Sequence, residues 1–237
     1  MVDLSLEVPR SWAAFAQLAA VAPLFTMAPR GDGHPVLVLP GFLAGDLSTV
    51  PLRTLLSRLG YDAHGWGLGR NMGPTADVVE GLTRAVDELG GGEARRVSIV
   101  GWSLGGVFGR ELARRFPDRI RQVISLGSPF NAEALGFGAS AEPLPVPSTA
   151  VYTRSDGVVD WRTAVQRTDA HSENVEVRGS HCGLGVNPAA VLVVADRLAL
   201  AEGDWAPFRP PPALRRWFPR PWDANVDVDD EETAWTA

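Results

Sequence analysis

Short runs that are almost entirely apolar alternate with longer runs of mixed polarity from residue 34 to residue 203. The apolar runs are HPVLVLPGF, the weaker YDAHGW, RVSIVG, IRQVISLGSPF, TAVYTRS and NVEVRGS. Continuous apolar runs of this kind indicate strands buried on both faces, as in a parallel sheet covered by helices. The pattern predicts an α/β fold with a doubly wound, mostly parallel sheet and helices on both faces.

The runs between these strands have the spacing of amphipathic helices. They are STVPLRTLLSRLG, TADVVEGLTRAVDELG, the segment after RVSIVG, the segment around VVDWRTAVQ, and NPAAVLVVADRLALAEG. Ser48 or Thr49 is expected to cap the first helix, because a hydroxyl accepts a hydrogen bond from a free N–H of the first turn. Gly60 is expected to end that helix.

The two ends of the chain differ from this alternating region, and three parts are predicted: 1–33, 34–203 and 204–237. The apolar stretch SWAAFAQLAAVAPLFTMA follows acidic residues and contains Gln17 and Pro23, which argues against a signal peptide or membrane span. A helix over 11–20 that packs on the α/β domain is expected there.

The third part begins with DWAPFRPPPALRRWFPRPW and ends in the acidic DANVDVDDEETAWTA. This proline density is expected to exclude a helix or a central strand. The aromatic part is predicted to lie as a strap across its own domain or across a partner subunit in a homo-oligomer. The acidic end is expected to be solvated.

Composition limits the compartment and the partners. The chain has 237 residues, of which 45% are hydrophobic, which is enough for one large core. Its net charge of −6 argues against nucleic-acid binding. The lone Cys182 excludes an intrachain disulfide, so a reducing compartment, the cytoplasm, is the expected location. No zinc-ligand spacing of Cys and His is present, and no metal or cofactor is predicted.

The sequence GWSLGG places Ser103 between a buried strand and a helix, with no room for an ordinary loop. A G-x-S-x-G turn in this context holds the serine in strained dihedral angles at the apex. Side chains at Gly101 and Gly105 would collide with neighbouring backbone. The pattern favours a nucleophilic serine over a structural one.

Two further strands end on residues that a serine nucleophile needs. TAVYTRSDG leads to Asp156, and NVEVRGSHCG leads to His181. Because the carboxyl ends of parallel strands meet at one edge, Ser103, Asp156 and His181 are expected to converge there. His181 is the candidate general base, and Asp156 the residue that orients it. The backbone N–H groups of Phe42 and Leu104 are the candidate oxyanion donors.

The chain resembles the α/β-hydrolase superfamily, and within it the compact bacterial lipases and esterases that lack a cap domain. The resemblance runs from about His34 to Gly203 and rests on LVLPGF, GWSLGG, YTRSDGVVDW and GSHCGLGVNP. It implies a Ser-Asp-His triad and cofactor-free hydrolysis of a small-molecule or lipid ester. The chain departs from the family in having Pro40-Gly41 where His-Gly is common, and in lacking the usual preceding antiparallel strands.

Other residues compete for some of these roles. Asp160 is an alternative to Asp156, although its position suits a helix start, and Glu133 is a further candidate. His34, His64 and His171 are expected to be solvated or structurally satisfied. The glycine-rich GWGLGRNMGP is either a loop with Trp66 or Asn71 facing substrate, or a rigid connector.

Only NAEALGFGASAEPLPVPS, residues 131–148, separates IRQVISLGSPF from TAVYTRS, which is too short for a helical cap domain, so an open site is expected. Substrate is expected to contact Trp66, Phe130, Leu135 and Phe137. Two other functions remain open at this point. An acyltransferase would use the same acyl-enzyme with an alcohol or amine acceptor, and a binding module would keep the fold without catalysis.

Overall fold

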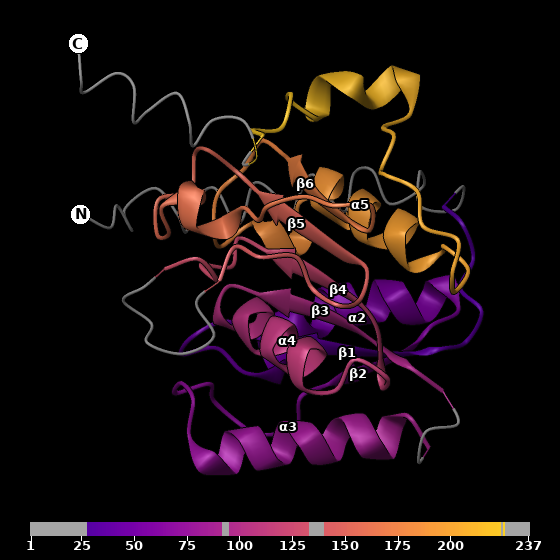
Figure 1. Ribbon diagram of the computed structural model, residues 1–237, viewed down its shortest axis with the longest axis vertical. Helices are drawn as coiled ribbons and strands as arrows, with labels where there is room; N and C mark the ends of the chain where they lie inside the picture. Colours follow the sequence, from indigo (N-terminus) through magenta and orange to yellow (C-terminus); the bar gives the residue numbers. More distant parts are fainter. Residues whose placement is uncertain (1–27, 92–94, 133–139, 224, 226–237) are drawn as a thin grey trace.

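A six-stranded sheet forms the centre of the computed structural model, which describes residues 28–91, 95–132, 140–223 and 225 (Figure 1). Every neighbouring pair of its strands is parallel, in the order β2-β1-β3-β4-β5-β6. The strands are β1 (Pro35–Leu39), β2 (Asp62–Gly65), β3 (Val97–Trp102), β4 (Ile120–Leu126), β5 (Ser148–Tyr152) and β6 (Ser172–Glu176). The strand order reverses between β1 and β3, and ligands of such sheets bind at that point.

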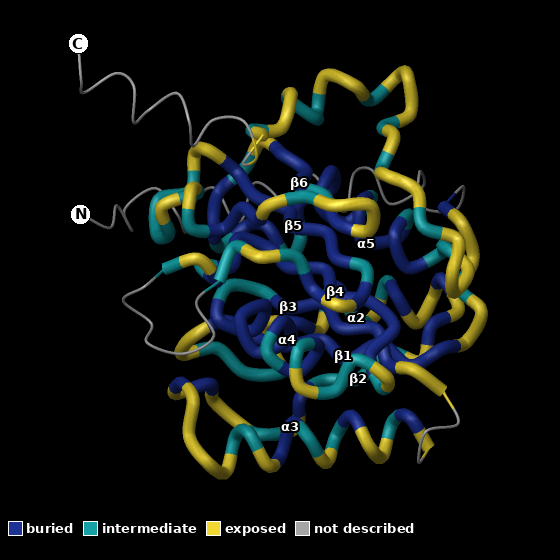
Figure 2. Tube along the Cα trace, in the orientation of Figure 1, coloured by how far each residue is buried: buried dark blue, intermediate teal, exposed yellow. Residues whose placement is uncertain are grey.

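Helices cover both faces of the sheet, as predicted. The α-helices are α2 (Asp46–Leu59), α3 (Ala76–Leu89), α4 (Leu104–Arg115) and α5 (Pro188–Leu198). Successive residues of β1 divide between two hydrophobic clusters. Val36 and Val38 pack with α2 and α5, whereas Leu37 and Leu39 pack with α3 and α4. The inner helix faces and the strands other than the edge strand β2 are mostly buried (Figure 2), and the doubly wound architecture is confirmed.

The start of α2 differs from the prediction. The helix begins at Asp46 with Gly45 as its N-cap and no side-chain cap. The Ser48 hydroxyl donates to the Gly45 carbonyl at 2.8 Å, and the Thr49 hydroxyl donates to the Asp46 carbonyl at 3.0 Å, so both lie inside the first turn. Gly60 ends the helix with φ of 101°, a left-handed conformation that glycine adopts without strain, as predicted.

The segment around VVDWRTAVQ was expected to be a helix and is only a short 3-10 turn, η3 (Trp161–Ala164). Its extension is stopped by a side chain of β6. Asn174 accepts a hydrogen bond from the Gln166 backbone N–H at 3.0 Å and donates to the Gln166 carbonyl at 2.7 Å. These two bonds occupy both backbone groups of Gln166, and Val165 before it is already extended, with φ of −111° and ψ of 146°.

The proline-rich segment contains one helical element that the sequence was expected to exclude, the 3-10 helix η5 (Pro212–Trp217). A proline in the first turn of such a helix loses nothing, because its N–H would be unpaired there. Phe208, Trp217 and Phe218 pack against the cluster that contains α5, and the Trp222 N–H donates to the Tyr152 hydroxyl at 2.7 Å. This part of the segment therefore contacts its own α/β domain (Figure 1).

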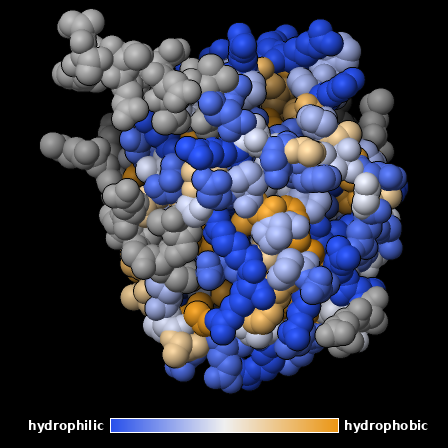
Figure 3. Space-filling model, viewed as in Figure 1, coloured by the Kyte–Doolittle hydropathy of each residue, from blue (hydrophilic) through white to orange (hydrophobic). Residues whose placement is uncertain are grey.

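Several expectations fall outside the described residues. They concern the helix over 11–20, the acidic end from 226, Glu133, Leu135 and Phe137. Within the described part of 127–147 the chain forms no helix after β4, in agreement with the absence of a large cap. In the described residues no helix is long and apolar enough to cross a membrane. On the face drawn in Figure 3, hydrophilic side chains predominate and apolar ones form small areas among them.

Replacement of Gly105 by alanine is expected to lower the free energy of unfolding by about 3 kcal/mol, the upper end of overpacking costs. The added Cβ would lie 2.4 Å from the Leu39 carbonyl oxygen and 2.8 Å from that of Pro40, both of which are backbone atoms. Gly185→Ala is the matched control, since its Cβ would meet only Trp102 at 4.0 Å. Equal urea midpoints for the two variants would contradict the close helix–strand contact.

Candidate active site

Ser103 lies at the apex between β3 and α4 in a strained backbone conformation. Its φ is 54° and its ψ is −124°, and it is one of two described non-glycine residues with positive φ. The Ser103 N–H donates to the Leu126 carbonyl at 2.8 Å, and its carbonyl accepts from the Gly106 N–H at 3.0 Å. An added Cβ at Gly101 would lie 2.4 Å from the Gly106 Cα, so the turn can form only around glycine. The geometry is that of a nucleophile elbow.

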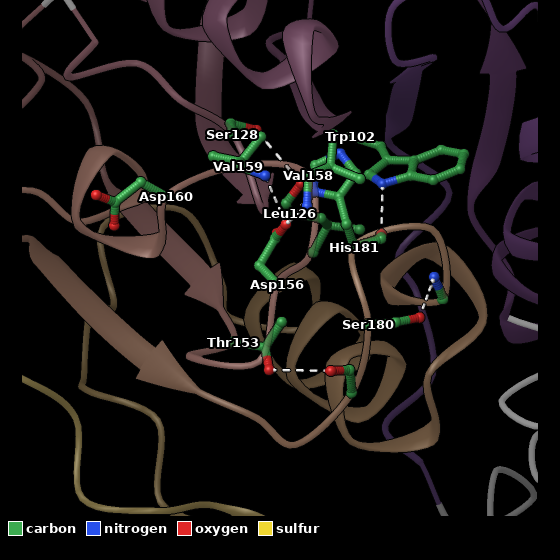
Figure 4. Close-up of polar contacts among 12 residues, drawn as sticks. Trp102, Leu126, Ser128, Thr153, Asp156, Val158, Val159, Asp160, Ser180 and His181 are labelled. Carbon is green, nitrogen blue, oxygen red and sulfur yellow. Dashed lines mark hydrogen bonds and ion pairs between the residues drawn. The ribbon is translucent and has the colours of Figure 1, made fainter. Parts of the chain in front are cut away.

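His181 and Asp156 form a buried pair in the loops after β6 and β5 (Figure 4). The distance from His181 Nδ1 to Asp156 Oδ2 is 2.7 Å, and their side chains are 5% and 2% exposed. The other carboxylate oxygen, Oδ1, accepts from the N–H groups of Val158 and Val159 at 2.8 and 2.7 Å. These contacts fix the carboxylate and favour the tautomer with the proton on Nδ1 and Nε2 free as a base.

Two residues that the sequence reasoning did not assign to the site hold this pair in place. The Trp102 indole N–H donates to the His181 carbonyl at 3.1 Å (Figure 4). Gly127, at the end of β4 with φ of 55°, leaves the space that the pair occupies. A Cβ there would lie 3.2 Å from His181 Nδ1 and 3.4 Å from Asp156 Oδ2.

Ser103 follows β3, whereas Asp156 and His181 follow β5 and β6, which β4 separates from β3. All three residues lie beyond the carboxyl ends of their strands, at the edge expected from the sequence. In the described structure no hydrogen bond joins the Ser103 hydroxyl to His181. Such catalytic hydrogen bonds are often long before substrate binds and shorten in the complex.

The loop after β1 brings a second backbone donor to Ser103. Gly41 lies against the serine, because a Cβ on Gly41 would be 3.1 Å from the Ser103 Cβ. Among the described residues, the N–H groups of Phe42 and Leu104 have no hydrogen-bond acceptor. Both are therefore available to bind negative charge beside the serine, and the Leu104 N–H also lies at the positive end of the α4 dipole.

Asn71 ties this loop to the glycine-rich segment after β2. Its side chain is fully buried, and Nδ2 donates to the Pro40 carbonyl at 2.9 Å. Its backbone N–H donates to the Ala44 carbonyl at 2.8 Å, and its carbonyl accepts from the Leu43 N–H at 2.7 Å. Three hydrogen bonds from one residue thus fix the backbone on both sides of Phe42. The structure supports the rigid-connector interpretation of GWGLGRNMGP.

Replacement of Asn71 by aspartate is expected to lower kcat by about a hundred-fold, since a shift of about 1 Å in a catalytic group has that effect. The change removes the donor to the Pro40 carbonyl and keeps a side chain of the same size. Asn174→Asp removes a comparable buried donor, to the Gln166 carbonyl, away from the loop. If both variants lose stability but neither loses kcat, Asn71 has no positioning role.

Two of the predicted substrate contacts are corrected by their burial. Trp66 is 2% exposed, lies in the core with Leu82, and donates its indole N–H to the Gly69 carbonyl at 2.9 Å. Phe130 is fully buried, with the Arg110 guanidinium 3.9 Å from its ring centroid. Both aromatic side chains are part of the packing beneath the site. Burial also lowers the pKa of Arg110 to about 9.

The competing candidates have other partners. Asp160 caps η3 by accepting from the Arg162 N–H at 3.0 Å. His34 contacts Asp32 and lies 2.9 Å from the Ser98 hydroxyl, and burial lowers the pKa of His34. His64 contacts Asp62 at 2.7 Å. Across the described ranges, no group of three or more His, Cys, Asp or Glu side chains is arranged to hold a metal ion.

Comparison with known proteins places this geometry among known folds. A family model described as the alpha/beta hydrolase fold matches residues 34–143. One similar solved structure, of the metagenome-derived lipolytic enzymes LipS and LipT, has a TM-score of 0.55 at 17% identity, covering 73% of this chain and 94% of that one. Lipase B of Aspergillus fumigatus has a TM-score of 0.56 at 18% identity, covering 73% and 54% respectively.

A thioesterase domain from the curacin biosynthetic pathway has a TM-score of 0.51 at 14% identity, covering 72% of this chain and 93% of that one. At these identities the likeness is one of fold. No curated protein sequence matches the chain.

Proposed function

We propose that the chain is a serine hydrolase of the α/β-hydrolase superfamily and that it cleaves carboxylic esters through an acyl-enzyme on Ser103. The observation that carries the proposal is the buried His181–Asp156 pair at the same sheet edge as the strained Ser103. A free serine hydroxyl is a weak nucleophile, and a neighbouring imidazole makes it reactive.

In the proposed reaction, His181 Nε2 takes the proton of the Ser103 hydroxyl as the serine oxygen attacks the ester carbonyl. Asp156 holds the imidazole and stabilises its positive charge. The oxyanion receives hydrogen bonds from the Phe42 and Leu104 N–H groups, each of which is worth about 3 kcal/mol in the barrier. The imidazolium then protonates the leaving alcohol, and water releases the acid by the same steps in reverse order.

A fluorophosphonate probe tests this proposal, because it phosphonylates only an activated serine. Intact mass and peptide mapping are expected to show one adduct per chain, on Ser103, together with turnover of p-nitrophenyl esters. Absence of an adduct on protein that circular dichroism shows to be folded would overturn the proposal and favour a non-catalytic binding module. An adduct with no turnover in water, but with product when an alcohol acceptor is added, would identify an acyltransferase.

A further inference from the structure

Exposed apolar side chains lie on and near the loop after β1, which carries the Phe42 N–H and is called the proposed oxyanion loop. In the part of the chain that the structure describes, the exposed large hydrophobic residues are Phe42 at 55%, Leu43 at 53%, Leu47 at 89%, Val50 at 42% and Met72 at 60%. Single exposed apolar residues scattered over a surface need no explanation, whereas a group of them marks an interaction site. These five residues are called the apolar rim below.

Hydrogen bonds join the segments that carry the apolar rim. The Leu43 N–H donates to the carbonyl of Asn71, which precedes Met72, at 2.7 Å. Leu47 and Val50 are three residues apart in α2 and so lie on neighbouring positions of the helix surface. Asp46, in the first turn of that helix, accepts from the N–H groups after β2. The three backbone segments that carry the apolar rim are therefore fixed relative to one another.

The conformation of Leu43 indicates that this surface is functional. Its φ is 63°, and the only other described non-glycine residue with positive φ is Ser103. A leucine is strained in this region, where glycine or asparagine is the usual choice. The Leu43 side chain is also more than half exposed, so burial does not offset the strain. Strain of this kind is concentrated at functional sites.

The position and charge of the apolar rim suit a lipid surface. Phe42 follows Gly41, which lies against Ser103, so the rim adjoins the proposed ester-binding site. Arg70 is exposed beside it and has no carboxylate partner among the described residues. The nearby Asp46 carboxylate keeps its charge but accepts from the Trp66 and Gly67 N–H groups, and no ion pair joins it to Arg70 among the described residues. The described part of this surface thus combines exposed apolar side chains with the exposed cation of Arg70, although the chain carries a net charge of −6.

We propose that the apolar rim docks the protein on the surface of aggregated lipid esters that carry anionic headgroups. This inference rests on the proposed function for the identity of the substrate site. Apolar side chains enter the acyl layer while the Arg70 guanidinium contacts phosphate, which leaves an ester beside the Phe42 N–H. A protein seated on the same surface would cover the approach to Ser103.

The test uses the full chain with Ser103→Ala, so that binding is measured without hydrolysis. Sedimentation with vesicles of phosphatidylcholine and phosphatidylglycerol is expected to carry the protein down, and vesicles of phosphatidylcholine alone to carry less. Adding Leu47→Glu is expected to lower the partition coefficient by about tenfold, since a buried leucine contributes roughly that much. A carboxylate in the first turn of α2 favours the helix dipole, so this variant is expected to fold.

Ser57→Glu is the matched control, because it adds the same charge to an exposed position near the other end of α2. It is expected to leave vesicle partition within twofold of the Ser103→Ala protein. Equal partition of the Leu47→Glu and Ser57→Glu proteins, or no sedimentation with either vesicle, would overturn the lipid proposal even if Ser103 is confirmed as the nucleophile. A dimer in solution that Leu47→Glu dissociates would instead make the rim an interface between copies.

Discussion

Replacement of Ser103 by alanine is expected to lower kcat for a p-nitrophenyl ester by about a million-fold, the scale seen when a serine nucleophile is removed. The melting temperature is expected to stay near that of the unmodified protein. In the described structure the Ser103 hydroxyl makes no hydrogen bond, so its loss leaves no buried partner unsatisfied. Alanine also adopts the positive φ of this position at about the same cost as serine. The substitution is therefore expected to lower activity without lowering stability.

Stopped-assay kinetics with a long incubation measure the residual rate, and thermal unfolding measures stability. Ser128→Ala is a suitable control, since Ser128 is also a buried serine near the elbow and its hydroxyl donates to the Gly101 carbonyl at 3.4 Å. Its turnover is expected to stay within tenfold of the unmodified protein. Residual activity of more than about 1% in Ser103→Ala would place the nucleophile elsewhere, because triad residues contribute far more than two orders of magnitude.

The sequence predicted the sheet and the positions of Ser103, Asp156 and His181 beyond the carboxyl ends of its strands, because both depend on one strong rule. Apolar runs between amphipathic ones form parallel strands, and the carboxyl ends of parallel strands meet at one edge. Asp156 lies nearer the end of β5 at Tyr152 than Asp160, which is four residues further on, and of the two only Asp156 contacts His181. Distance from a strand end was therefore enough to rank the two carboxylates.

Contacts between loops could not be predicted from the sequence, because loop residues do not follow the periodicity of a helix or a strand. Asn71 and Pro40 are 31 residues apart, and they meet only because β2 pairs with β1 and places their following loops together. The start of α2 at Asp46 has a similar cause. The Asp46 side chain binds backbone N–H groups after β2 rather than acting as a cap, and Gly45 fills the cap position.

Apolar composition alone also did not distinguish a substrate contact from core packing. Trp66 and Phe130 follow strands at the site edge, yet both side chains are buried. The exposed apolar residues lie instead on the oxyanion loop, α2 and the loop after β2. Helix and strand periodicity predicts which residues of a helix or strand face the core. The exposed apolar residues lie mostly in loops or at the start of a helix, where this periodicity does not apply.

Replacement of Asp156 by asparagine is expected to lower kcat by about ten-thousand-fold, through the wrong tautomer of His181. The Val158 and Val159 N–H groups both point at Oδ1, so an asparagine must keep its carbonyl oxygen on that side. Its NH2 group then faces His181 Nδ1, which is forced to accept a hydrogen bond. The ring proton moves to Nε2, and that nitrogen can no longer take the proton of Ser103.

Asp160→Asn is the matched control for this substitution. Asp160 is exposed, and an asparagine oxygen still accepts from the Arg162 N–H, so kcat is expected to stay within twofold. Asp156→Ala is expected to keep more of His181 in the tautomer with the proton on Nδ1 than Asp156→Asn does. The alanine removes the hydrogen-bond acceptor but presents no donor to Nδ1. Full activity of Asp156→Asn together with an inactive Asp160→Asn would reverse the assignment of the acid, since the tautomer argument applies only to the carboxylate that contacts His181.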